Sequence, residues 1–140
     1  DTAMASWDVA VTTPEGPLRL LAVHPFPPTD AVQWAADHAT IREAARGADL
    51  IVGDFNAGPD HAPMRALAGI RLRATTELAN EGWQPTWPAN GQFGVKGIPL
   101  PPSVQIDHVL IGDRLAAIST RTLRVEDTDH LAVVAEVAFR

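Results

Sequence analysis

Hydrophobic and polar positions alternate over the first part of the chain, which is the spacing of half-buried strands. Trp7 to Thr13 alternates and is rich in β-branched residues, so it predicts a strand. The Pro-Glu-Gly sequence at 14–16 is typical of a turn, and Leu18 to Val23 predicts a second strand. We therefore expect a hairpin that ends at His24, because the following Pro-Phe-Pro-Pro sequence cannot continue a ladder.

The spacing then changes from that of a strand to that of a helix. We expect Thr29 to be the N-cap, Asp30 to lie in the first turn and Gly47 to close the helix. The positions that recur at helical spacing are Ala31, Trp34, Ala35, His38, Ile41 and Ala45. Trp34 is expected in the core, whereas His38 and His61 are expected at the surface or at helix ends.

The remaining pattern alternates short apolar runs with turns. Asp49 to Asp54 predicts a strand buried on both faces, and a second helix is expected from His61 to about Ala68. Ile70 to Thr75 predicts another strand, and Gly82 to Val104 is rich in Gly and Pro, which indicates a long functional loop. Three final strands are expected over Gln105 to Ile111, Ile118 to Val125 and Leu131 to Phe139. The prediction is an α/β fold with a mixed β-sheet and flanking helices, in a single domain over residues 1–140.

Composition narrows the class of protein. With 140 residues, 46% hydrophobic and 20% charged, the chain is suited to a soluble globular domain, and no apolar run approaches the ~20 residues of a membrane span. The chain has no cysteine, which excludes thiolate metal sites but does not indicate a compartment. A membrane segment upstream of Asp1, if present, would place the domain at a membrane surface. A net charge of −6 and a single lysine, Lys96, argue against broad electrostatic capture of nucleic acid.

The strongest local signal for chemistry is Gly53-Asp54-Phe55-Asn56. Its apolar strand delivers Asp54 and Asn56 to one face, two residues apart. A carboxylate can orient or deprotonate water, and an amide can donate to a phosphoryl oxygen. A strand end with an Asx-type turn explains this motif about equally well when it is taken alone.

Two further motifs carry carboxylates beside histidines. Asp107 lies inside an apolar strand, where an unpaired carboxylate is costly, so it needs a partner, and His130 is the natural candidate. His108 points to the face opposite Asp107 and is interpreted as structural. Asp129 would then be free to face a cation.

In this order, the motifs resemble the endonuclease/exonuclease/phosphatase superfamily, the DNase-I-like phosphoesterases. The segments that carry the resemblance span nearly the whole chain: Leu20-Leu21-Ala22-Val23-His24, Gly53-Asp54-Phe55-Asn56, Pro85-Thr86-Trp87, Ile106-Asp107-His108 and Thr128-Asp129-His130. The resemblance implies a phosphoester substrate, which is a lipid headgroup, a small phosphoester or nucleic acid. The low basic content favours the first two.

The resemblance also implies a role for each matching residue. Asp54 would activate the attacking water and Asn56 would bind a phosphoryl oxygen. His130, held by Asp107, would contact the scissile phosphate, and His24 would be a second donor. Asp129 would be a metal ligand for Mg²⁺ (or Mn²⁺ or Ca²⁺), which neutralises charge on the phosphoryl group.

The chain also departs from the family pattern. Family members have about twice this length and form a four-layered α/β/β/α sandwich, whose first half supplies an asparagine and the glutamate that is the main metal ligand. Neither motif is present, and Glu15, Glu43 and Glu77 do not follow strands in the expected context. The chain is thus expected to be the C-terminal portion of the domain, with the N-terminal half as its missing partner. The hypotheses are a metal-dependent phosphoesterase, as part of a longer enzyme, and a catalytically inactive binding or interaction module that retains the fold.

Overall fold

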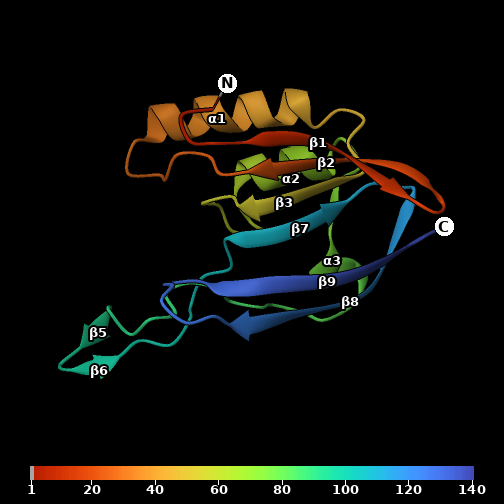
Figure 1. Ribbon diagram of the computed structural model, residues 1–140. Coiled ribbons are helices and arrows are strands. Elements are labelled where there is room, and N and C mark those ends of the chain that lie inside the picture. The colour runs from red at the N-terminus through yellow and green to blue at the C-terminus, as the bar shows by residue number, and fades with distance from the viewer. Residues whose placement is uncertain (1) are drawn as a thin grey trace.

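A five-stranded mixed sheet forms the centre of the protein in the computed structural model, which describes residues 2–140 (Figure 1). Its spatial order is β1 (Trp7–Thr13), β2 (Gly16–Val23), β3 (Leu50–Asp54), β7 (Asp107–Ile111) and β4 (Arg73–Ala74). The helices are α1 (Ala31–Ala44), α2 (Ala62–Ala68) and α3 (Thr75–Leu78), and two hairpins lie outside the sheet: β5 (Gly94–Val95) with β6 (Ile98–Pro99), and β8 (Leu115–Arg124) with β9 (Leu131–Phe139). The predicted α/β class with a mixed sheet is confirmed.

The directions of the strands bring three strand termini to one edge of the sheet. β2 and β3 are parallel, so both of their C-terminal ends lie at this edge. β7 runs antiparallel to β3, so it begins there. Within this register Val23 pairs with Gly53, and Asp54 pairs with Asp107.

The face of the sheet toward α1 and α2 holds the main core (Figure 1). Its most deeply buried side chains, each at most 3% exposed, come from both layers: Leu21, Ile51 and Leu110 from the strands, with Ile41 and Leu67 from the helices. Alternate strand residues point to this face, as the pleat requires. The β3 terminus that carries Asp54 is therefore anchored by a buried strand.

The opposite face is covered less completely, by the β8–β9 hairpin and α3. Leu50, Ile111 and Leu115 are buried there, with Val137 and Phe139 partly buried against them. Trp7 at the start of β1 stays 62% exposed. The two faces thus differ in how well they are packed.

The first helix differs from its prediction in two respects. Its N-cap is Asp30 and not Thr29, because the Asp30 carboxylate accepts hydrogen bonds from the backbone N–H groups of residues 32 and 33. His38 is buried, 5% exposed, and not at the surface. Among the described residues, no helix has the length and apolar character needed to span a membrane.

Several predicted boundaries were wrong beyond the second helix. The chain turns at Arg71 (φ 71°), so only Arg73–Ala74 of the predicted 70–75 strand pairs, and a short helix follows. Strands predicted to begin at Gln105 and Ile118 begin instead at Asp107 and Leu115. The 82–104 loop contains the small β5–β6 hairpin, which projects from the body (Figure 1).

Candidate active site

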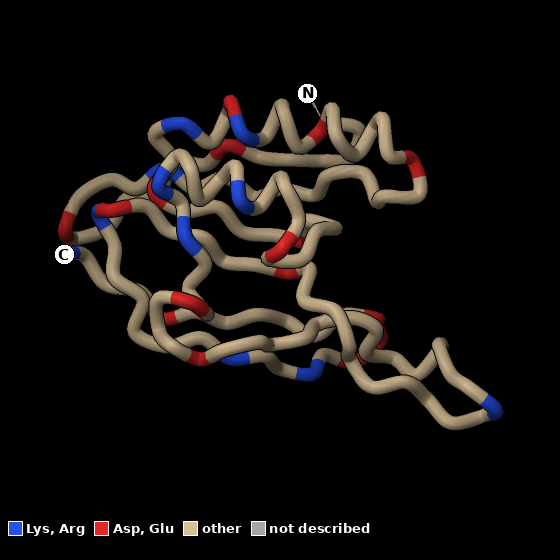
Figure 2. Tube along the Cα trace, turned by 180° about the vertical axis from the view of Figure 1, so that it is seen from behind, with Lys and Arg blue, Asp and Glu red and all other residues tan. Residues whose placement is uncertain are grey.

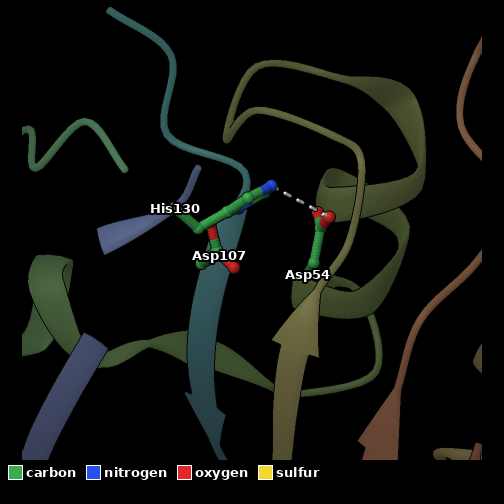
Figure 3. Close-up of side chains that lie close together, drawn as sticks. All are labelled: Asp54, Asp107 and His130. Atoms are coloured by element: carbon green, nitrogen blue, oxygen red, sulfur yellow. Dashed lines mark hydrogen bonds and ion pairs between the residues drawn. The ribbon is translucent and has the colours of Figure 1, made fainter. Parts of the chain in front are cut away.

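Two carboxylates and one imidazole meet at the sheet edge where β3 ends and β7 begins. Asp54 closes β3, Asp107 opens β7 and His130 precedes β9, and the three side chains point toward one another (Figure 3). Each offers a ligand atom within 4.8 Å of the others. Oxygen and imidazole nitrogen are ligands that divalent cations accept, so this group fits a cation.

Asp107 orients His130, as the sequence predicted. Nδ1 of His130 lies 2.8 Å from Oδ2 of Asp107. Hydrogen bonding to this carboxylate is the main cause that raises the pKa of His130, with further contributions from the charges of Asp107, Asp54 and Asp129, against burial. The ring is thereby favoured in its protonated form, and Nε2 is turned toward Asp54, 3.9 Å from Oδ2.

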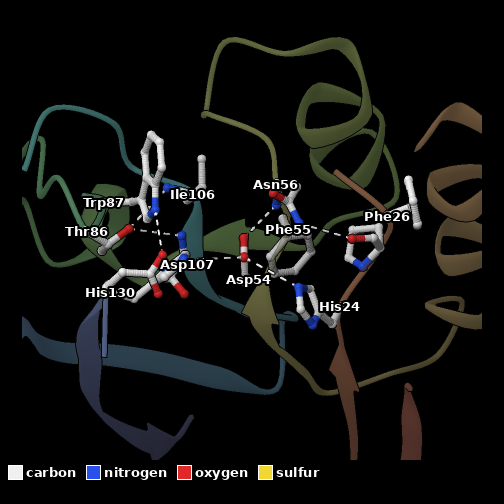
Figure 4. A network of polar contacts seen from close by, with 12 residues as sticks. His24, Phe26, Asp54, Phe55, Asn56, Thr86, Trp87, Ile106, Asp107 and His130 are labelled. Atoms are coloured by element: carbon white, nitrogen blue, oxygen red, sulfur yellow. Dashed lines mark hydrogen bonds and ion pairs between the residues drawn. The ribbon is translucent and has the colours of Figure 1, made fainter. Parts of the chain in front are cut away.

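The side chain of Asp54 is 17% exposed and lies between two histidines. Nε2 of His24 lies 3.6 Å from Oδ2 of Asp54, on the side away from His130 (Figure 4). Burial raises the pKa of Asp54, and the charge of Asp107 raises it further, although the hydrogen bond from the Asn56 backbone opposes this. A carboxylate whose pKa is raised is a stronger base toward water.

Asn56 reaches the site through a turn and not through strand alternation. Its φ of 48° lies in the left-handed region, and its backbone N–H donates to Oδ1 of Asp54 at 2.7 Å. This is the Asx-type turn that the sequence offered as an alternative. The Asn56 side chain donates from Nδ2 to the carbonyl of Pro25 at 3.1 Å.

Asp129 lies outside the group of three. Its Oδ2 accepts a hydrogen bond from Nε1 of Trp87 at 3.2 Å, a contact between residues far apart in sequence. Its role as a metal ligand stays a prediction.

Thr86 is a supporting residue whose role was not predicted. Its side chain is fully buried, and its Oγ1 accepts from the backbone N–H groups of Ile106 and Asp107, both at 3.3 Å (Figure 4). It therefore holds the start of β7, where Asp107 stands. The Pro-Thr-Trp motif marked this segment, but the sequence did not indicate what the hydroxyl would contact.

A cavity of about 690 Å³ opens beside Asn56 and His130. Its apolar walls come from loops on both sides: Pro28, Pro59, Trp83, Trp87, Val104 and Ile106. None of the described residues that line it is Lys or Arg. Trp87 lies at the wall of this cavity, and Trp83, which also lines it, is 63% exposed.

Comparisons with known proteins identify the family of the chain. A family profile described as "Endonuclease/Exonuclease/phosphatase family" matches residues 5–130. The chain belongs to the endonuclease/exonuclease/phosphatase family. No curated protein matches it.

Solved structures of the family share this fold. An endonuclease/exonuclease/phosphatase from Beutenbergia cavernae is 21% identical with a TM-score of 0.76, over 96% of this chain and 39% of that one. A 3′ phosphatase from Neisseria, bound to a product DNA hairpin, is 21% identical with a TM-score of 0.62, over 93% and 64%. A mannosyl-6-phosphatase from Bacteroides thetaiotaomicron is 17% identical with a TM-score of 0.55, over 88% and 51%. The chain thus spans 39–64% of the length of these structures.

Proposed function

We propose that this chain carries the water-activating and phosphate-binding groups of a divalent-metal-dependent phosphoesterase. The observation that carries the proposal is the placement of Asp54 between His24 and His130, with Asp107 behind His130. In this arrangement a base and two imidazole donors face the same space.

The residues of the chain account for the proton transfers and for charge stabilisation. Asp54 accepts a proton from water as the water oxygen forms a bond to phosphorus and the bond from phosphorus to the leaving oxygen breaks. Protonated His130 donates from Nε2 to a phosphoryl oxygen, and Asp107 stabilises the positive ring. His24, 43% exposed in its side chain, is placed to donate from the other side.

A divalent cation, when bound, neutralises charge on the phosphoryl group and the leaving oxygen. Asp129 is the ligand implied by the resemblance. The Asp54, Asp107 and His130 group would hold a cation only with His130 neutral, so it is an alternative to the donor role of His130. Because the chain spans about half of its structural neighbours, we propose that the intact protein supplies the principal carboxylate from residues outside these 140. Mg²⁺, with its preference for oxygen ligands, is the expected ion, and Mn²⁺ and Ca²⁺ are the alternatives.

The cavity and the charges favour an uncharged leaving group. Apolar and aromatic walls without Lys or Arg suit a flat or apolar group better than successive phosphates of nucleic acid. Over the described residues 2–140, Lys and Arg are interspersed with Asp and Glu along the trace (Figure 2). A small phosphoester or a lipid headgroup is therefore the proposed substrate class.

Hydrolysis by the intact protein and its Asp54→Asn and His130→Asn variants tests the proposal. With Mg²⁺ and bis(p-nitrophenyl) phosphate, each variant should lose about 10²- to 10⁴-fold in kcat, since each removes a group acting in the transition state. Asp8→Asn is the control, because Asp8 is exposed on β1 and pairs with Arg19.

The inactive binding module makes the opposite prediction. Equal rates for wild type and Asp54→Asn would refute the phosphoesterase proposal. Magnesium-dependent stabilisation of the folded protein without any turnover would favour the binding module.

A further inference from the structure

Three aromatic rings behind the site reach the backbone of the turn that follows Asp54. Their ring N–H groups face three consecutive carbonyls: His38 Nε2 to Phe55 O at 3.0 Å, Trp34 Nε1 to Asn56 O at 3.1 Å, and His108 Nε2 to Ala57 O at 2.9 Å. Two rings come from α1 and the third from β7. The turn is therefore held from two separate elements.

The direction of these hydrogen bonds fixes the tautomer of the two histidines. A carbonyl oxygen only accepts, so each Nε2 must carry the proton. Burial lowers the pKa of His38 and of His108, which favours the neutral rings. Within residues 2–140, Nδ1 of His38 has no hydrogen-bond partner, so a second proton would place a charged N–H in the interior without an acceptor.

The turn needs this support because of its own conformation. Asn56 has a φ of 48°, a left-handed conformation that asparagine tolerates better than most residues but that is still less favoured than an extended or helical one. Phe55 and Ala57 are fully buried, so water cannot replace a donor that their carbonyls lose. The same turn fixes Asp54, through the bond between its Oδ1 and the Asn56 N–H.

We infer that Trp34, His38 and His108 are positioning residues for the reaction. Their ring N–H groups lock the 55–57 backbone and so hold the Asp54 carboxylate and the Asn56 amide in place. None belongs to the Asp54, Asp107 and His130 group. The inference rests on the proposed function for its kinetic consequence, but its structural part can be tested without turnover.

Substitution of His38 by Leu and by Gln in the intact protein separates the N–H donor from the packing of the ring. His38→Leu removes the donor, and kcat should fall about 10- to 100-fold with KM unchanged within about twofold, because small misplacements of catalytic groups are costly. His38→Gln returns an amide N–H and should restore kcat to within about threefold of wild type. Ile41→Val, at a buried position on the same helix, should lower stability and leave kcat unchanged.

Hydrogen exchange provides the readout that does not depend on activity. In His38→Leu, the backbone amides of Phe55 and Asn56 should exchange roughly tenfold faster, and His38→Gln should restore their protection. Trp34→Phe, which keeps an aromatic ring without its donor, should behave like His38→Leu and replaces it if that variant does not fold.

The outcomes separate the two proposals. If no form hydrolyses a phosphoester but exchange follows this pattern, the proposed function fails and the positioning role stands. Wild-type kcat and protection in both His38→Leu and Trp34→Phe would overturn the positioning role. So would a His38→Gln variant as impaired as His38→Leu.

Discussion

The turn at residues 54–57 and the connection at residues 82–104 both bring polar groups to the site, but they are held differently. The turn is tied down along its whole length by ring N–H groups and by its own Asx-type hydrogen bond. The long connection is held at its base, where Thr86 and Trp87 bond to the backbone of Val104 and Ala89 to that of Asp129, and residues 90–101 are exposed. Ile98, in the projecting hairpin, is 71% exposed.

This difference shows what fixes the side chains of the candidate site in this fold. Asp54 is fixed through the 55–57 turn, whose carbonyls accept from rings on α1 and β7, so its position depends on the packing of these elements. Trp87 is held near the site, yet Phe93, which precedes β5, is 43% exposed and meets it only with a tilted ring, with 4.9 Å between ring centroids. Substitutions should therefore have large effects at the turn and small ones in the hairpin.

The largest contrast is expected between two glycines, Gly53 and Gly97. Gly53 has a φ of 147°, and a Cβ there would lie 1.9 Å from the carbonyl oxygen of Val23, so Gly53→Ala should separate β2 from β3. We expect it to lower the free energy of unfolding by more than about 4 kcal/mol. Gly97→Ala, with a φ of 80° but open space around it, should cost about 1–2 kcal/mol. Urea denaturation of both variants measures the free energy of unfolding. Equal losses for the two variants would contradict the difference expected between the turn and the hairpin.

The next effect concerns Asp107, whose carboxylate is hydrogen-bonded to His130. Asp107→Asn keeps the shape of the side chain but removes the charge that raises the pKa of His130. In the intact protein, kcat/KM should fall about 10²-fold or more, and the alkaline limb of its pH profile should move to lower pH, since His130 loses its proton earlier. Asp113→Asn, an exposed carboxylate, is the control. An alkaline limb that does not move would show that Asp107 does not tune His130.

The smallest expected effect is on how the free energy of unfolding depends on pH. It tests whether His38 stays neutral in the folded protein. Burial lowers the pKa of His38, and this outweighs the hydrogen bond to the Phe55 backbone and the charge of Asp37, which both raise it; the charge of His61 lowers it further. Its contribution to stability is therefore complete above the unfolded pKa of about 6.5 and is lost as the pH falls below that value. Wild type should lose stability from pH 7 to pH 5.5 more steeply than His38→Gln, by up to about 1.4 kcal/mol per pH unit.

His130 provides a comparison of opposite sign. Its pKa is raised, so its contribution is present below about pH 6.5 and is lost as the pH rises through its folded pKa. His130→Gln should thus alter the alkaline side of the stability profile. Equal slopes for wild type and His38→Gln on the acid side would contradict a neutral, buried His38.

The sequence was sufficient for the parts of the site that follow from strand patterns. An aspartate in an apolar strand had to have a partner, and Asp107 has His130 at 2.8 Å. The same alternation placed His108 on the opposite face, and it is buried there, 3% exposed. These conclusions needed only the period of the strand and the cost of an unpaired charge.

The remaining features of the site depend on contacts that no local pattern in the sequence indicates. His38 bonds to a backbone carbonyl, and every residue has one, so no spacing indicates the pairing. Asp129 follows a turn, and its partner Trp87 comes from a distant loop. Asn56 lies in a left-handed turn, where strand alternation no longer applies.

The pairing of β3 with β7 also determines when the site can form during folding. Residues 50–54 and 107–111 are neighbours in the sheet, with α2, α3 and the β5–β6 hairpin between them in the chain. Bringing the ends of so long a loop together lowers the entropy of the chain before native contacts can offset the loss, and this slows folding. Asp54 meets Asp107 only after this closure, so the candidate site can form only once β3 and β7 have paired.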